Sequence, residues 1–192
     1  MRIITGKYKG RHFDIPRSFK ARPTTDFAKE NIFNVLLQYV DFEGATALDL
    51  FSGTGSITLE LLSRGCQQVV SVELDRDHHR FISECLKKLG ASPTPAKGGP
   101  VASAATAGGA IPIRGDVFRF LKSCRQQFDI IFADPPYALK ELPEIPDLIF
   151  AKGLLKDGGI FVFEHGKDHD FSGHPRFLEH RQYGSVNFSL FR

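Results

Sequence analysis

The residues best suited to chemistry in this sequence are Asp134, Pro135, Pro136 and Tyr137, which follow a short apolar run at positions 130–133. Such a run suits a strand that is buried on both faces. The two prolines end it, because neither has an N–H to donate to a neighbouring strand. We therefore expect an acid, a rigid turn and an aromatic ring together at the carboxyl end of a buried strand, where open α/β sheets bind ligands.

This set of groups suits methyl transfer to an exocyclic amino nitrogen of a nucleobase. Such an amine is a poor nucleophile because its lone pair is conjugated with the ring. The Asp134 carboxylate and the Pro135 carbonyl could accept hydrogen bonds from its two N–H groups. These bonds would favour a pyramidal nitrogen and direct its lone pair at an incoming methyl group. Tyr137 can stack on the base, which is worth about 1–3 kcal/mol. The alternative is a strand that simply ends in a Pro-Pro turn.

A second site signal is a strand followed by a glycine turn and a helix. An apolar run at 45–51 leads into Gly53 and Gly55, and a helix is expected over 54–64. This arrangement is typical of a nucleoside-binding βα turn, although an ordinary tight turn is the alternative. Position 58, where a dinucleotide site needs its third glycine, is Thr58. A ligand with a nucleoside and an amino-acid tail therefore fits better, and Asp49 could hold its ammonium group.

Two further acids follow the next expected strands. Glu73 ends the run 68–74, about 20 residues after the glycines, where an acid can bond both ribose hydroxyls. Asp75 is a second candidate, or a cap for the helix expected over 76–89. Asp116 follows a short strand at 111–114 and could accept from an adenine amino group, or cap the helix 117–124.

The N-terminal region is basic. Residues 1–30 hold eight Lys or Arg against three acids, in a chain of 192 residues with a net charge of +3. This asymmetry indicates contact with phosphates or a merely solvated face. Strands are expected at 2–5 and 12–15, and a helix over 26–39. Arg22 and Thr24 could contact the cofactor or ribose-phosphate, or only cap that helix.

The remaining segments complete an α/β pattern. We expect a short helix at 147–150, a strand at 160–164, and a hairpin formed by 177–183 and 186–191. Residues 91–110 are rich in Ala, Gly, Pro, Ser and Thr and indicate a flexible loop. The late histidines favour a polar loop over a metal site, because no ligand spacing repeats. Scattered cysteines, no long apolar run and no signal segment point to the cytoplasm.

The ordered motifs resemble those of class I S-adenosylmethionine-dependent methyltransferases. More narrowly, residues 1–10, the stretch Arg22-Pro23-Thr24-Thr25-Asp26 with the helix around Phe33, and residues 49–56 resemble the RsmD family of 16S rRNA guanine-N2 methyltransferases. The resemblance covers nearly the whole chain. It departs from the family in the low-complexity stretch 91–110 and in Cys85, where Asn is common.

The resemblance implies an α/β, Rossmann-like fold: a seven-stranded, mostly parallel sheet with a C-terminal antiparallel hairpin and a small N-terminal hairpin and helix. We expect residues 1–40 to be an RNA-binding extension and residues 41–192 the methyltransferase domain. The implied catalytic residues are Asp134, Pro135, Pro136 and Tyr137. The cofactor-binding residues, with their flanking positions, are Asp49, Phe51, Gly53, Thr54, Gly55, Glu73, Leu74, Asp116 and Val117. The expected substrate contacts are Arg2, Lys7, Lys9, Arg11, Arg22 and Thr24.

The implied partners and reaction follow from the same resemblance. The cofactor would be S-adenosylmethionine, and the substrate 16S rRNA or the assembling small ribosomal subunit. A monomer is the default expectation, no membrane is expected, and no metal is needed because the positive sulfur already activates the leaving group. Two rivals remain. An adenine-N6 DNA methyltransferase uses the same motif type but usually needs a target-recognition domain, and a non-catalytic RNA-binding module would retain only the nucleoside pocket.

Overall fold

One seven-stranded sheet forms the centre of the molecule. The computed structural model describes residues 1–19, 25–91 and 109–192. The sheet has the order β3-β2-β1-β4-β5-β7-β6. Its strands are β1 (Thr46–Leu50), β2 (Gln68–Glu73), β3 (Gly109–Arg114), β4 (Phe128–Ala133), β5 (Leu155–His165), β6 (Phe177–Tyr183) and β7 (Val186–Phe191). Only β7 runs antiparallel to both of its neighbours, β5 and β6, and the expected fold class with its C-terminal hairpin is confirmed.

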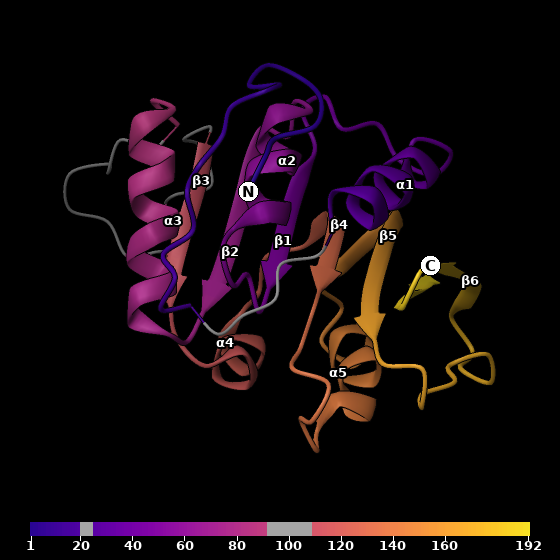
Figure 1. The fold of residues 1–192 in the computed structure, drawn as a ribbon. Coiled ribbons are helices and arrows are strands. Elements are labelled where there is room, and N and C mark those ends of the chain that lie inside the picture. The colour runs from indigo at the N-terminus through magenta and orange to yellow at the C-terminus, as the bar shows by residue number, and fades with distance from the viewer. Residues whose placement is uncertain (20–24, 92–108) are drawn as a thin grey trace.

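Helices cover both faces of the sheet (Figure 1). They are α1 (Asp26–Leu36), α2 (Ser56–Ser63), α3 (Arg76–Lys88), α4 (Val117–Ser123) and α5 (Ile145–Ala151), the last preceded by the short 3-10 helix η2 (Leu142–Glu144). Alternate strand residues face opposite layers. Ala47 on β1 belongs to the apolar cluster under α1, α2 and α3, whereas Leu48 belongs to the cluster under α4 and α5. The result is a three-layer sandwich whose buried strands have both faces covered.

The chain order places a switch point between β1 and β4. From β1 the chain moves outward through β2 to β3 and then returns to pair β4 with β1. In open α/β sheets, ligands bind beyond the carboxyl ends of the strands at such a point. The register Leu50↔Ala133 sets the ends of β1 and β4 side by side. The glycine turn and the Asp134 turn therefore leave the sheet next to each other.

The expected N-terminal hairpin is shorter than the ranges 2–5 and 12–15. Its two arms pair around one antiparallel bridge, Arg2↔His12, and the Ile3 N–H donates to the Arg11 carbonyl. The turn between the arms rests on α2: the Lys7 N–H donates to the Ser63 carbonyl, and Gly6 lies so close to that carbonyl that no side chain would fit. The hairpin is thus fixed to a helix surface at its turn.

Element boundaries differ from the expectations elsewhere by a few residues. The helix α1 ends at Leu36 rather than at 39, α5 is longer than the expected 147–150, and β5 begins at Leu155 instead of 160. Arg22 and Thr24, and nearly all of the stretch 91–110, lie outside the described residues. In the parts of the chain that the structure describes, no helix is both long and apolar enough to cross a membrane.

Candidate active site

The glycine turn after β1 has the backbone that its sequence predicts. Gly53 and Gly55 have φ angles of 53° and 76°, a region that favours glycine. A Cβ on Gly55 would lie 2.8 Å from the Ile82 side chain of α3, so the turn is packed tightly under that helix. Phe51, directly after β1, also has a positive φ of 60°. Such strain in a non-glycine residue costs roughly 1–2 kcal/mol and is concentrated at functional sites.

Asp49 is a buried carboxylate beneath this turn. Only 2% of the residue is exposed, and its Oδ2 accepts a 2.5 Å hydrogen bond from Thr58 Oγ1. Thr58 is the residue that stands where a dinucleotide site has its third glycine, and here it orients Asp49. Burial raises the pKa of Asp49 to about 7, an effect that the Thr58 hydrogen bonds oppose and the Glu73 charge adds to. A cationic ligand group would favour its ionised form.

Glu73, at the end of β2, closes the glycine turn from the other side. Its Oε2 accepts from the Gly53 N–H at 2.7 Å, and its Oε1 accepts from the Asp75 N–H at 2.8 Å. Each carboxylate oxygen has a second lone pair, so both can still accept a ribose hydroxyl. Asp75 itself caps α3, through bonds from Asp77 and His78, which is the second of its two sequence interpretations.

The residues around these acids complete a partly open surface. Leu74, beside Glu73, is 65% exposed, so its apolar side chain can contact a ligand. Asp116 caps α4 by accepting from the Arg119 N–H, and Val117 beyond it is buried. Asp116 therefore caps the helix, as one of its two sequence interpretations predicts. Its other carboxylate oxygen can still accept a hydrogen bond from a ligand. Thr54, inside the turn, is buried.

Asp134 stands at the end of β4 among other carboxylates. Its N–H donates to the Leu50 carbonyl of β1 at 3.3 Å, and the register Ala133↔Phe163 brings Glu164 of β5 beside it. Burial, then the charges of Glu164 and Asp49, raise the pKa of Asp134 well above its ordinary value. The structure thus brings the Asp134 turn and the glycine turn to one edge of the sheet.

Tyr137 is held over this edge by a residue that the sequence analysis did not select. Its hydroxyl donates to Glu164 Oε1 at 3.0 Å, and Glu164 is 4% exposed. The ring lies against the backbone of Gly166, where an added Cβ would sit 3.4 Å from it, yet 46% of Tyr137 is exposed. Burial, followed by the charges of Glu164 and Asp134, raises the pKa of Tyr137. The ring is both fixed and available for stacking.

The two prolines between these side chains differ in their carbonyl groups. The Pro136 carbonyl accepts from the Leu139 N–H at 2.9 Å, which closes the turn. Within the described residues, the Pro135 carbonyl has no hydrogen-bond donor. Pro135 is buried, and its carbonyl keeps its lone pairs for the acceptor role that the sequence pattern predicts beside Asp134.

Those of the predicted substrate residues that the structure describes lie on the N-terminal segment, away from Asp134. Lys7, Lys9 and Arg11 are exposed, while Arg2 is half-exposed and pairs with Asp26 at 3.2 Å. The structure therefore does not bring this group together with the catalytic motif. These residues form a separate basic surface on the N-terminal segment.

Sequence reasoning also missed a buried ionic cluster under that surface. Glu60 of α2 is fully buried and accepts from the N–H groups of Ile4 and Thr5 and from Arg64 Nε. Lys29 of α1, 1% exposed, donates to the Arg2 carbonyl and to Ser56 Oγ at the start of α2. The cluster fastens the N-terminal segment and α1 to the helix that follows the glycine turn. An acid inside an apolar helix is its only sequence signal.

The C-terminal histidines make hydrogen bonds with neighbouring groups. His165 lies 2.8 Å from Ser189 Oγ and 2.9 Å from the Gly166 carbonyl, and burial lowers its pKa. Across the described ranges, no group of three or more His, Cys, Asp or Glu side chains is arranged to hold a metal ion.

Fold and site together define a class I S-adenosylmethionine-dependent methyltransferase, with an acid at the end of each of the central strands around a glycine turn. The chain belongs to the family described as "Conserved hypothetical protein 95", which matches residues 1–192, and it is a methyltransferase of the RsmD type.

Relatives and solved structures support this assignment over most of the chain. "Ribosomal RNA small subunit methyltransferase D" of Haemophilus influenzae is 29% identical over 100% of this chain and 93% of the relative. The protein of the same name from Escherichia coli K12 is 30% identical over 85% of this chain and 74% of the relative. The solved structure of a hypothetical protein from Thermus thermophilus is 28% identical, covers 100% of this chain and 99% of that one, and has a TM-score of 0.81.

The residues present fit the cofactor of this class. S-adenosylmethionine carries an ammonium group, ribose hydroxyls and an adenine ring, and it supplies a methyl group already activated by a positive sulfur. Asp49 offers a buried acid with its orientation fixed, Glu73 offers lone pairs at the glycine turn, and Leu74 offers exposed apolar surface. We expect these three residues to hold the ammonium, the ribose and the adenine, respectively.

Proposed function

We propose that this protein methylates the exocyclic N2 amine of a guanine in 16S rRNA of the small ribosomal subunit. One observation carries the proposal: Asp134, the Pro135 carbonyl without a donor among the described residues and the Glu164-anchored Tyr137 ring lie at the same sheet edge as the glycine turn. The names of the relatives from H. influenzae and E. coli support rRNA as the substrate class.

Each group of the motif has a distinct role in this proposal. The Asp134 carboxylate and the Pro135 carbonyl accept hydrogen bonds from the two N–H groups of the guanine amine and hold its lone pair toward the methyl donor. Tyr137 stacks on the base after the nucleotide leaves its own stack, at a cost of a few kcal/mol. Glu164 keeps the Tyr137 ring in place through the hydroxyl. Catalysis is then mainly positioning, because the leaving group needs no further activation.

The same carboxylate suits the proton that the reaction releases. Once methylated, the amine nitrogen carries one proton too many and must transfer it to a base. Burial and then neighbouring negative charge raise the pKa of Asp134, so its carboxylate is a better proton acceptor than an ordinary aspartate. No metal is required for any of these steps.

The N-terminal region, residues 1–40, serves as the RNA-binding extension in this proposal. Lys7, Lys9 and Arg11 present exposed positive charge on a segment that is fixed to α2 by the buried Glu60. Fixed cations bind a phosphate backbone with less ordering cost than mobile ones. The protein would thus contact rRNA at the extension and react with it at the sheet edge.

The test is methyl transfer from radiolabelled cofactor to small ribosomal subunits, naked 16S rRNA and duplex DNA, followed by mass spectrometry of the nucleosides. Label in N2-methylguanosine from an rRNA-containing sample is the expected result. Label in N6-methyladenine of DNA would instead identify a DNA methyltransferase. RNA binding without label in any sample would indicate a non-catalytic RNA-binding module.

A further inference from the structure

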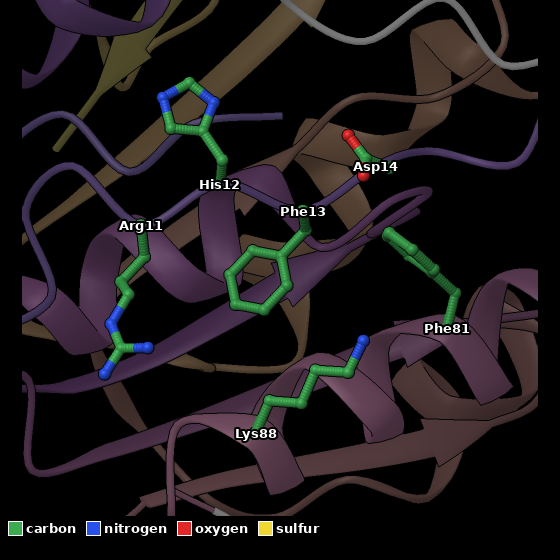
Figure 2. Close-up of a pocket in the computed structure, with 6 residues that line it drawn as sticks. All are labelled: Arg11, His12, Phe13, Asp14, Phe81 and Lys88. Carbon is green, nitrogen blue, oxygen red and sulfur yellow. The ribbon is translucent and has the colours of Figure 1, made fainter.

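A cavity of about 430 Å³ lies between the N-terminal segment and α3, outside the site described above. Its lining consists of Arg11, His12, Phe13, Asp14, Phe81 and Lys88 (Figure 2). This volume falls within the range of roughly 300–1,000 Å³ that small-ligand sites occupy. Two aromatic rings can stack on a base, and two long cationic side chains can bind phosphate. Together they suit a nucleotide better than a purely apolar ligand.

Both walls of the cavity are positioned by regular backbone geometry. Phe81 and Lys88 are seven residues apart on α3 and thus project from the same face, about 10 Å apart along the helix axis. Figure 2 shows Arg11 and Phe13 leaving the opposite chain toward Lys88, with the His12 ring on the other side. Phe13 is 8% exposed and forms an apolar floor.

The cations of the cavity are available to a ligand. Among the described residues, neither Arg11 nor Lys88 has an ion pair, whereas Arg2, Lys29 and Arg64 each have one. The lining therefore holds two uncompensated cations and one carboxylate, that of Asp14. Asp14 would repel a bare phosphate dianion but can accept from a ribose 2′-hydroxyl or a base amine, which favours a whole nucleotide of RNA.

The cavity is also connected to the sheet edge. The chain runs from Arg11 alongside α3 toward the carboxyl ends of the strands (Figure 1), where the Phe19 ring lies 4.2 Å from the His78 ring and 5.5 Å from the Phe81 ring. Ile82, next to Phe81, packs on Gly55 of the glycine turn. An RNA strand seated in the cavity can follow this segment toward the proposed active site.

We propose that this cavity is a second RNA subsite, which holds one nucleotide of the substrate at a distance from the guanine to be methylated. Arg11 and Lys88 bind its phosphates, and its base or ribose lies against Phe13 and Phe81. The inference rests on the proposed function for the identity of the RNA, but RNA binding at the cavity can be measured without methyl transfer.

The test compares Lys88→Glu with Lys87→Glu, a matched control. Both lysines are exposed residues of α3, yet Lys87 is turned about 100° away and does not line the cavity. Binding of a fluorescent fragment of 16S rRNA is followed by anisotropy over a range of salt concentrations. We expect Lys88→Glu, and likewise Arg11→Glu, to weaken binding several-fold more than the control and to lower the salt slope by about 0.7 for each lost phosphate contact.

Cofactor binding separates this subsite from the active site. Affinity for S-adenosylhomocysteine, measured by calorimetry, should be equal in the wild type and in all variants. Equal RNA affinity and equal salt slope for Lys88→Glu and Lys87→Glu would overturn the subsite. A wild-type protein that methylates no rRNA, with Lys88→Glu still selectively impaired in RNA binding, would refute the proposed function and leave the subsite standing.

Discussion

The hydrogen bond between Tyr137 and Glu164 gives the sharpest test of how the base is held. A hydrogen bond to a charged group contributes about 1.5–3 kcal/mol. Tyr137 is 46% exposed, so solvent competes for its hydroxyl, and a net value of about 1–2 kcal/mol is more appropriate. Tyr137→Phe keeps the ring for stacking and removes only this bond. We expect a loss of roughly 5- to 30-fold in kcat/KM for RNA.

Substitution of Glu164, the partner of Tyr137, tests whether the loss comes from the contact between these two residues. Glu164→Gln removes the charge at the other end, and the double variant closes a thermodynamic cycle. Because Tyr137 and Glu164 are in direct contact, the double variant should lose less than the sum of the two single losses, with a coupling of about 0.5–2 kcal/mol. Tyr183→Phe, on the outer strand β6, is a control that removes a tyrosine hydroxyl outside this pair.

The assay is steady-state transfer of labelled methyl groups to RNA, with cofactor affinity measured separately by calorimetry. The pair acts on the base, so affinity for S-adenosylhomocysteine should be unchanged in every variant. A Tyr137→Phe protein within about twofold of the wild type in kcat/KM, or strictly additive losses in the cycle, would refute the idea that Glu164 positions the ring.

Three further predictions follow from buried charges. Asp134→Ala should reduce turnover far more than affinity for S-adenosylmethionine, and equal loss of both in kinetics and calorimetry would place Asp134 in the cofactor site instead. Burial raises the pKa of Asp49 to about 7, and ionised Asp49 is the form that pairs with an ammonium group. Cofactor affinity should therefore rise between pH 6 and pH 8, as calorimetry would show, and a pH-independent affinity or an unchanged trend in Asp49→Asn would contradict that role. Glu60→Gln leaves Lys29 buried without its carboxylate and should lower the free energy of unfolding by about 3–5 kcal/mol in urea titrations, whereas a loss below about 1 kcal/mol would show that the cluster is not ionic.

The sequence by itself determined the strands, the turns and the chemistry that they carry. Two prolines end a strand wherever they occur, because they lack an N–H, and Gly53 and Gly55 permit a turn that other residues resist. These are local properties, so the roles of Asp134, Tyr137 and the glycine turn can be predicted from the residues next to them in the sequence. The order of the elements then fixed the α/β fold, because parallel strands joined by helices have few topologies.

Only the tertiary structure decided which distant side chains become partners. Glu164 is remote from Tyr137 in sequence and meets it because β5 lies beside β4 in one particular register. Glu60 and Lys29 pair across two helices, and Glu60 also accepts from the Ile4 N–H, which docks the N-terminal segment on α2. Arg11 and Lys88 line one cavity because that segment follows α3. Such contacts depend on strand order, register and helix packing, which no short stretch of sequence encodes.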